Sequence, residues 1–434
     1  MTARDRAREW LLRRSTVRSL WGRYRRSQLH RQYEARRERY AREANQRGLA
    51  YREADVARLV RARLAARGLA PVPRPPGEVH TFAFVPQIGW HAALLGDLRE
   101  LGPVTLFDYA QLGFQWEEFY WARAAGRARR RAMNAMILPA LREAYVRRAV
   151  DWVFVYASGA EISADTIRRI TGEFGIPVVN MCLDDKQSWT GAWMGDHRAG
   201  QIDIAATFDL SWTSARVACE WYLVEGARPL YMPEGFDAST FHPVEVSQDI
   251  PVSFIGGAYG FRPDVVEFLR RRGIPVRTFG FGWGTRSVWG AEEVEVINRS
   301  VINLGMGGIG YSEDLTNVKT RDFEIPGTGG GLYLTSFNAD LARHFIVGEE
   351  IACYRSRDEM LELIRYYLRH PEEARLIAGR ARARSLREHR WLHRYRHICQ
   401  ILGVLTGEGP ECLAALADGW SEHGREVSGA GQER

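Results

Sequence analysis

The chain has 434 residues, of which 45% are hydrophobic, and this length exceeds what one core usually organises, so two domains with additional segments are expected. No run of 18 apolar residues is present and the basic N-terminus lacks the apolar stretch of a signal peptide, which argues against a membrane-spanning chain and predicts a cytoplasmic protein. The formal net charge is +7, and the five cysteines lack a CxxC pair, which argues against a disulfide scaffold and a zinc site.

The N-terminal segment, residues 1–76, is predicted to be a basic helical extension that ends in a proline-rich linker. Residues 1–70 contain 20 arginines and 7 acidic residues, a net charge of +13, so the basic character of the chain belongs to this extension. The first 67 residues lack proline and are rich in helix formers, whereas four prolines follow between residues 71 and 76. The arginine-rich face is interpreted as a solvated surface, with anionic lipid at the inner membrane face or a protein partner as open alternatives.

Residues 77–231 show alternating strand and helix patterns, which are typical of a parallel sheet with helices on both faces. Strands are predicted at residues 80–86, 104–109, 151–158 and 177–183, and helices at residues 90–101, 116–148 and 162–173. Residues 208–230 complete this series. The pattern therefore predicts a Rossmann-like N-terminal domain.

A second series follows the turn-rich connection at residues 231–243. Strands are predicted at 251–257, 275–282, 301–306, 331–335 and 350–356, and helices at 261–273, 292–300, from 356 onward and at 371–403. Residues 232–405 are therefore predicted to form a second Rossmann-like domain, and residues 406–434 a tail whose end is polar, glycine-rich and disordered. Two such domains are expected to bind ligands in a cleft at the carboxyl ends of their strands.

The segment KTRDFEIPGTGGG, residues 319–331, combines two cations, a carboxylate and a glycine-rich turn. Lys319 and Arg321 suit an anion, Glu324 suits sugar hydroxyls, and the glycines allow a backbone to approach a phosphate closely. Lys319 and Lys186 are the two lysines among 60 basic residues, which suggests that a compact ammonium group matters at both positions. The segment predicts a nucleotide-sugar site.

Residues 78–405 resemble glycosyltransferases of the GT-B fold in the group 1 family, and within them the spore-maturation (CgeB-like) branch. The most specific signals are KTRDFEIPGTGGGLYLT, the strand IACYRS, and YYLRHPEEARLIAGRARARSLREHRWLHR near the end. MPEGFDASTFHP between the domains and FIGG with Arg262 at the start of the second domain add to the match. In the N-terminal half the match is loose and rests mainly on LDD, residues 183–185.

The resemblance implies that the second domain binds the nucleotide donor. Glu324 matches the carboxylate that binds the ribose hydroxyls, although before Pro326 it is also suited to cap a turn. Lys319 and Arg321 are candidates for catalytic charge on the leaving diphosphate. Related enzymes often carry a second acid eight residues before the glutamate, where this chain has Thr316, so their contacts to the donor sugar do not transfer.

The resemblance also implies two glycine-containing phosphate sites. Gly256, Gly257 and Arg262 match the phosphate-side loop of the donor domain, with the plain start of a helix as the alternative role of the arginine. A second group matches the glycine turn at the start of a helix beneath the diphosphate: Gly327, Thr328, Gly329 and Gly330.

The first domain offers three candidates for the acceptor side. His91 lies in the first strand-to-helix loop, where inverting GT-B enzymes often place a catalytic base, although loop histidines are more often surface or packing residues. Asp184 and Asp185 follow a predicted strand beside Lys186 and are expected to face the cleft. They are candidates for binding an acceptor hydroxyl or acting as the base, with capping of a turn as the alternative.

The sequence thus predicts a metal-independent, hexosyltransferase-like glycosyltransferase without a cofactor. Its co-substrate would be a UDP-, GDP- or dTDP-sugar, and its acceptor a hydroxyl group of a glycan, protein or small molecule. Retention is slightly favoured over inversion by the similarity of the donor domain to retaining families.

Three other functions are weighed against this one. A catalytically inactive scaffold that binds a partner or membrane through the N-terminal helices is the main alternative. Specific nucleic-acid binding is disfavoured because residues 1–70 lack regular aromatic interleaving. An NAD enzyme is disfavoured because GxGxxG at residues 305–310 precedes the polar segment YSEDLTN rather than an amphipathic helix.

Overall fold

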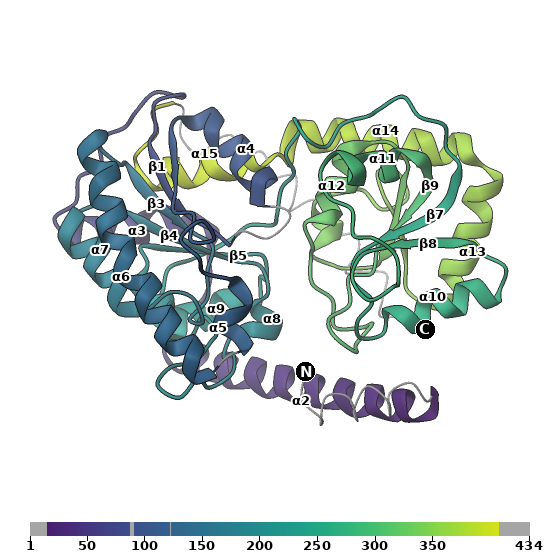
Figure 1. Ribbon diagram of the computed structural model, residues 1–434, viewed down its shortest axis with the longest axis horizontal. Helices are drawn as coiled ribbons and strands as arrows, with labels where there is room; N and C mark the ends of the chain where they lie inside the picture. The colour runs from purple at the N-terminus through teal and green to yellow at the C-terminus, as the bar shows by residue number, and fades with distance from the viewer. Residues whose placement is uncertain (1–14, 87–90, 122, 408–434) are drawn as a thin grey trace. The chain divides into compact units, whose positions relative to one another are not determined.

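The computed structural model describes residues 15–86, 91–121 and 123–407 (Figure 1). Contacts divide the described chain into two units, and each unit contains one parallel sheet. Among the described residues, the β1–β6 unit comprises 40–241, 339–345 and 383–407. The β7–β11 unit comprises residues 15–39, 242–338 and 346–382. The prediction of an α/β fold with two Rossmann-like sheets is confirmed.

The β1–β6 unit has the strand order β2-β1-β3-β4-β5-β6. Its fully buried strands carry apolar side chains on both faces, as a doubly covered parallel sheet requires. One core forms around Leu94, Trp212 and Tyr395, and the other around Phe82 and Ile137. The strands are β1 (Thr81–Phe84), β2 (Val104–Leu106), β3 (Trp152–Val155), β4 (Val178–Cys182), β5 (Leu210–Thr213) and β6 (Pro229–Tyr231).

Helices surround this sheet and account for the predicted helical patterns. They are α3 (Glu53–Ala66), α4 (His91–Leu101), α5 (Trp116–Trp121), α6 (Arg123–Arg147), α7 (Ala164–Phe174), the short α8 (Asp185–Ser188), α9 (Ala218–Val224) and α15 (Trp391–Leu402). Two 3-10 turns, Ala205–Thr207 and Leu341–Arg343, complete the unit. Helix α7 begins at Ser163, whose hydroxyl accepts a hydrogen bond from the Thr166 amide, and ends at Gly175 in the left-handed conformation.

The β7–β11 unit has the strand order β11-β10-β9-β7-β8, with every pair parallel. The strands are β7 (Ile250–Ile255), β8 (Val276–Phe279), β9 (Ser300–Leu304), β10 (Leu332–Ser336) and β11 (Ala352–Tyr354). The helices are α10 (Arg262–Arg271), α11 (Ala291–Arg299), α12 (Arg321–Thr328), α13 (Arg357–Arg369) and most of α14 (Pro371–Glu388). At the start of α13 the Ser356 hydroxyl accepts from the Glu359 amide, and the Glu359 carboxylate accepts from the amide of Arg355, the residue before the cap.

Two long helical predictions are divided in the structure. The N-terminal extension forms α2 (Ser15–Gln46) and α3, and the segment 371–403 forms α14 and α15. Helix α15 packs on the β1–β6 unit, where the Tyr395 hydroxyl donates to the Leu94 carbonyl at 2.8 Å and the Leu392 amide donates to Asp97 at 2.8 Å. The end of the predicted second domain therefore returns to the first sheet.

Among the described residues, no helix is long and apolar enough to cross a membrane. The same residues contain no group of three or more histidine, cysteine or acidic side chains that could hold a metal ion. Cys182, Cys219, Cys353 and Cys399 are free thiols, and three of them are buried. Cys412 and the predicted disordered tail lie outside the described residues.

Candidate functional site

A glycine loop follows β7 at the carboxyl edge of the second sheet. The Gly256 amide donates to the Phe279 carbonyl at 2.8 Å, and the Gly256 carbonyl accepts from the Trp283 indole at 2.7 Å. Gly256 has φ +149°, and a Cβ at this position would lie 2.8 Å from Nη1 of Arg321. Glycine is therefore required both for the backbone conformation and for the approach of the guanidinium group.

Arg262 and Arg321 bring two positive charges to this loop. Arg262 is the first residue of α10, is 1% exposed, and lies 4.1 Å from the ring centroid of Tyr259. Each guanidinium also lies 5.5 Å from the ring centroid of Phe254, so the two groups share one aromatic neighbour. Desolvation, with the nearby charge of Arg321 adding to it, lowers the pKa of Arg262 to about 10. Arg262 therefore still carries its charge at neutral pH.

These two charges are not neutralised by an ion pair within the part of the chain that the structure describes. Nη1 of Arg262 donates to the Gly257 carbonyl at 3.2 Å, but its Nε and Nη1 of Arg321 are buried without a hydrogen-bond partner there. Glu293 of α11 interacts with the charge of Arg321, but desolvation raises the pKa of Glu293 to about 7. The loop therefore presents donors and excess positive charge, which suits an anion with several oxygen atoms.

The three charged residues predicted from the KTRDFEIPGTGGG segment lie at the start of α12, with Lys319 two residues before the helix and Arg321 and Glu324 within it. The Lys319 amide donates to Asp322 at 2.8 Å, and the Tyr333 hydroxyl donates to the other carboxylate oxygen of Asp322. These bonds hold the chain as it enters the helix. Arg321 is its first residue, and Glu324, which is 6% exposed, lies one turn further along. The start of α12 thus places Lys319, Arg321 and Glu324 together.

The glycine turn was predicted at the wrong end of a helix. Gly327 and Thr328 form the last turn of α12, Gly329 ends the helix in the left-handed conformation, and Gly330 leads into β10. Thr328 is buried, and its hydroxyl donates to the Glu324 carbonyl at 2.7 Å. A Cβ on Gly330 would meet Asn298, so close packing against α11 explains this glycine. The expected cradle at a helix start is not formed by these residues.

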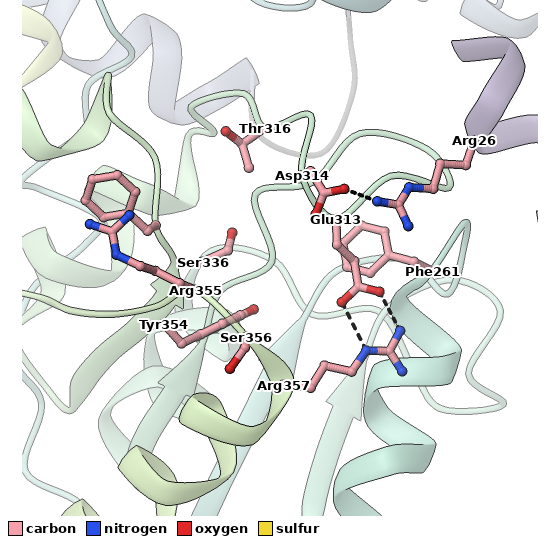
Figure 2. A pocket seen from close by; sticks show the side chains of 11 residues that line it. Arg26, Phe261, Glu313, Asp314, Thr316, Ser336, Tyr354, Arg355, Ser356 and Arg357 are labelled. Atoms are coloured by element: carbon pink, nitrogen blue, oxygen red, sulfur yellow. Dashed lines mark hydrogen bonds and ion pairs between the residues drawn. The ribbon is translucent and has the colours of Figure 1, made fainter. Parts of the chain in front are cut away.

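A cavity of about 380 Å³ opens at the carboxyl ends of β10 and β11 (Figure 2). The two charged pairs that line it are Arg357 with Glu313 and Arg26 with Asp314. Arg355 lies over the ring of Phe337 at 3.6 Å. The remaining lining residues are Phe261, Thr316, Ser336, Tyr354 and Ser356. Thr316, which replaces the second acid of related enzymes, thus lines a polar cavity. This cavity lies at the carboxyl edge of the second sheet, as does the glycine loop after β7.

The acceptor-side candidates belong to the β1–β6 unit. Asp184 is exposed directly after β4, whereas Asp185 is fully buried and accepts hydrogen bonds from Thr213 at 2.5 Å and Tyr222 at 3.1 Å. Desolvation raises the pKa of Asp185 to about 6 despite these bonds. The expectation that Asp185 faces a cleft was wrong, because its carboxylate fastens α8 to its neighbours. Lys186 pairs with Asp340 of the same unit at 3.5 Å.

His91 is the first residue of α4. The loop before it, residues 87–90, and its side chain lie outside the described part of the structure. The backbone places His91 after β1 and Asp184 after β4, which are two carboxyl ends of one parallel sheet.

Sequence reasoning missed several residues around the glycine loop after β7 and the start of α12. Tyr259 and Glu293 lie beside the two guanidinium groups, and Asp322 with Tyr333 fixes the start of α12. Asp322 stands between Arg321 and Glu324 in the segment already singled out, so its position was a usable signal. Tyr259 and Glu293 are distant in sequence from that segment, and only the fold brings them to it.

Comparisons with known proteins give a family match and similar solved structures. A family model described as glycosyl transferase-like matches residues 262–400. Among solved structures, the Anabaena protein HepE in complex with UDP-glucose is similar, with a TM-score of 0.50, 10% identity, and coverage of 74% of this chain and 99% of HepE. Its complex with UDP and glucose gives a TM-score of 0.50 at 11% identity with the same coverage.

Sucrose-phosphate synthase from Thermosynechococcus elongatus matches with a TM-score of 0.49 and 12% identity, covering 81% of this chain and 100% of that one. Among curated proteins, no sequence matches this chain. The match to HepE concerns the fold, and it confirms the predicted GT-B class of two parallel-sheet units.

Proposed function

We propose that this protein is a glycosyltransferase whose β7–β11 unit binds the diphosphate of a nucleotide sugar. The observation that carries the proposal is the glycine loop at Gly256 with the guanidinium groups of Arg262 and Arg321, which no described carboxylate pairs as a salt bridge. A buried cation of this kind is costly unless a counter-ion binds. A diphosphate supplies several oxygen acceptors in one group and would pair with both guanidiniums.

The proposed chemistry follows from where negative charge develops. When the bond between the sugar and the diphosphate breaks, the leaving diphosphate gains charge, and fixed cations stabilise that state more than the ground state. Arg262, Arg321 and Lys319 are proposed to supply this stabilisation without a metal ion. Glu324, one helical turn after Arg321, is proposed to accept hydrogen bonds from the ribose hydroxyls.

The similar proteins support the same class of substrate. The family match covers Arg262, α12 and α13, which are the elements that build the loop and the cavity. HepE is described in complex with UDP and UDP-glucose, which makes a UDP-sugar the first donor to test, with GDP- and dTDP-sugars as the others. Membership of the CgeB-like branch and the hexosyltransferase activity are part of the proposal.

The acceptor is proposed to be a hydroxyl group whose proton is taken by His91 or Asp184. Both stand at carboxyl ends of strands in the β1–β6 unit, the edge at which ligands of parallel sheets bind. The pH dependence of turnover in His91→Ala and Asp184→Asn, compared with the parent protein, tests this assignment. Profiles that match the parent in both variants would reject both residues.

A thermal-shift panel of UDP, GDP and dTDP tests nucleotide binding. A ligand at about 100 times its dissociation constant stabilises the folded protein by roughly 2.7 kcal/mol, so one of the three should raise the melting temperature of the full chain. The shift should shrink in Arg262→Ala. Slow release of free nucleotide from the matching nucleotide sugar then distinguishes an active transferase from a binding-only scaffold. The absence of a shift with all three nucleotides would contradict the proposal.

A further inference from the structure

The cavity at β10 and β11 has one wall that comes from the N-terminal extension. Arg26 of helix α2 lines the cavity and pairs with Asp314, which also lines it (Figure 2). All other lining residues come from the sheet edge, the loops and the start of α13 in the β7–β11 unit.

Several contacts hold α2 against the loop that connects β9 to α12. His30 Nε2 lies 2.7 Å from the Ser312 hydroxyl, one turn of helix after Arg26. A Cβ on Gly22 would lie 3.5 Å from the ring of Tyr311, and the side chain of Leu29 lies near Gly310. Residues at spacings of three and four share one face of a helix, so α2 presents one continuous face to residues 310–314.

The loop held by α2 is itself an ordered structure. The Ser312 hydroxyl, which meets His30, also accepts from the Leu315 amide at 3.0 Å, and the Asn317 amide donates to the Gly307 carbonyl at 3.0 Å. Glu313 pairs with Arg357, the first residue of α13. Asp314 pairs with Arg26. The loop is therefore fastened on both sides, immediately before it delivers Lys319 and Arg321.

The lining of the cavity suits a hydroxyl-rich molecule. Thr316, Ser336 and Ser356 offer hydroxyl groups, and the two acid–guanidinium pairs offer both acceptors and donors. A guanidinium has five N–H donors, so pairing with one carboxylate leaves Arg26 donors for a ligand. The volume lies at the lower end of the range for small-molecule sites, which is adequate for one monosaccharide.

The cavity and the glycine loop after β7 belong to the same edge of the second sheet. The strand order of this sheet is β11-β10-β9-β7-β8. The cavity lies at the carboxyl ends of β10 and β11, and the two guanidinium groups lie beside the loop that follows β7. Phe261 lines the cavity and is followed directly by Arg262. Thr316 lines it three residues before Lys319. A sugar in the cavity and a diphosphate at the loop would therefore share the same connecting segments.

We propose that helix α2 completes the sugar-binding part of the donor site, with Arg26 as a specificity-determining residue that contacts the sugar. This inference rests on the proposed function, because it assigns the cavity to the sugar of the same nucleotide donor. Under this proposal the arginine-rich extension contacts the donor bound by its own chain, rather than a membrane or a protein partner.

The test separates recognition of the nucleotide from recognition of the sugar. Dissociation constants are measured by calorimetry on the full chain for UDP, GDP and dTDP and for UDP-glucose, GDP-mannose and dTDP-glucose. The wild type should bind one sugar form more tightly than its diphosphate. In Arg26→Ala that advantage should fall by about tenfold, as for loss of a hydrogen bond to a charged group, while the diphosphate alone binds as before.

Arg23→Ala is the matched control, because Arg23 is exposed on the same helix and lines no part of the cavity. It should leave both affinities unchanged, and melting temperatures establish that all variants are folded. Two results would overturn this inference and leave the proposed function standing. In the first, the wild type binds a nucleoside diphosphate but binds no nucleotide sugar more tightly; in the second, Arg26→Ala keeps the full affinity advantage of the nucleotide sugar. A wild type that binds none of the six compounds would overturn the proposed function and this inference with it.

Discussion

Arg262 and Arg321 show how strongly the β7–β11 unit is arranged for an anion. Two like charges beside one phenyl ring repel each other and lose hydration, which lowers the pKa of Arg262 to about 10. Glu293, the acid that interacts with Arg321, has a pKa raised to about 7 and so is only partly ionised at neutral pH. The unit therefore keeps a local excess of positive charge that folding alone does not require.

Removing one of these cations is expected to slow turnover. In Arg321→Ala and Lys319→Ala, the leaving diphosphate loses a fixed partner, and loss of one such donor typically lowers the rate by about 100- to 1,000-fold. Glu324→Ala is expected instead to raise the dissociation constant of the nucleotide, because it removes acceptors for the ribose. Steady-state turnover and calorimetric binding separate the two effects.

Arg271→Ala is a suitable control, since this arginine is exposed at the far end of α10 and pairs only with Glu267 among the described residues. Its turnover should equal that of the parent protein. Unchanged turnover in both Lys319→Ala and Arg321→Ala would refute the assignment of the diphosphate to these cations.

At the scale of elements, the loop after β7 depends on a single backbone conformation. Gly256→Ala adds a methyl group where φ is +149° and where Nη1 of Arg321 would lie 2.8 Å from the new atom. The guanidinium must then move away from the loop, so nucleotide affinity is expected to fall by at least about tenfold.

Calorimetry with the nucleoside diphosphate that binds the parent protein measures this loss. Gly273→Ala is the matched control, because Gly273 also has positive φ, at +81°, but has no atom within 4 Å of an added Cβ. It shares the backbone strain without the steric conflict. Equal affinities in the two variants would show that strain, and not displacement of Arg321, accounts for any loss.

The sequence identified the charged residues of α12, but it did not predict that the segment through Pro326 is helical. Pro326 and the following glycines are typical of a turn, and they led to the prediction of a glycine cradle. In the structure Phe323 and Ile325 are buried, and Asp322 is fixed by Tyr333 and the Lys319 amide, so tertiary packing extends the helix through Pro326. Charge and spacing thus predicted Lys319, Arg321 and Glu324, whereas the helix depends on partners distant in sequence.

The strands were the most predictable elements, because parallel strands buried on both faces are continuous apolar runs bounded by glycine, proline or polar residues. The cavity was not predictable in this way. Its lining combines Arg26, Thr316 and Arg355, which come from three separate segments, and nothing in the local pattern of any segment indicates the other two.

At the scale of the whole molecule, the β1–β6 unit carries a buried cluster of basic side chains where the chain returns to it. The rings of His344 and His389 meet edge to face with their centroids 5.6 Å apart, and His393 and His397 follow on α15, with Arg394 among them. Desolvation lowers the pKa of His393 and His397 to about 4 and holds the pKa of His344 and His389 well below the usual range. The facing acidic groups are Glu53, Glu234 and Glu388.

This cluster is expected to make the folded protein sensitive to acid. An unfolded chain takes up a proton on each histidine below about pH 6.5. In the folded chain His393 and His397 do so only near pH 4, so the free energy of unfolding falls as pH decreases between these values. Each such histidine contributes a slope of about 1.4 kcal/mol per pH unit. Asp185, with its pKa raised to about 6, contributes the opposite slope over part of this range.

The variant His397→Gln separates the contribution of one histidine to the pH dependence from the opposing contribution of Asp185. In His397→Gln, the free energy of unfolding, measured by denaturant titration at pH 6 and pH 5, should decrease less than in the parent by about 1.4 kcal/mol over that unit. The comparison uses the slope with pH, so a uniform loss of stability from the substitution does not affect it. His242→Gln, at an exposed position of the other unit, should keep the parental slope. Equal slopes in the parent and His397→Gln would mean that His397 is protonated in the folded protein, and the cluster would then stabilise the unit as a charged rather than a neutral group.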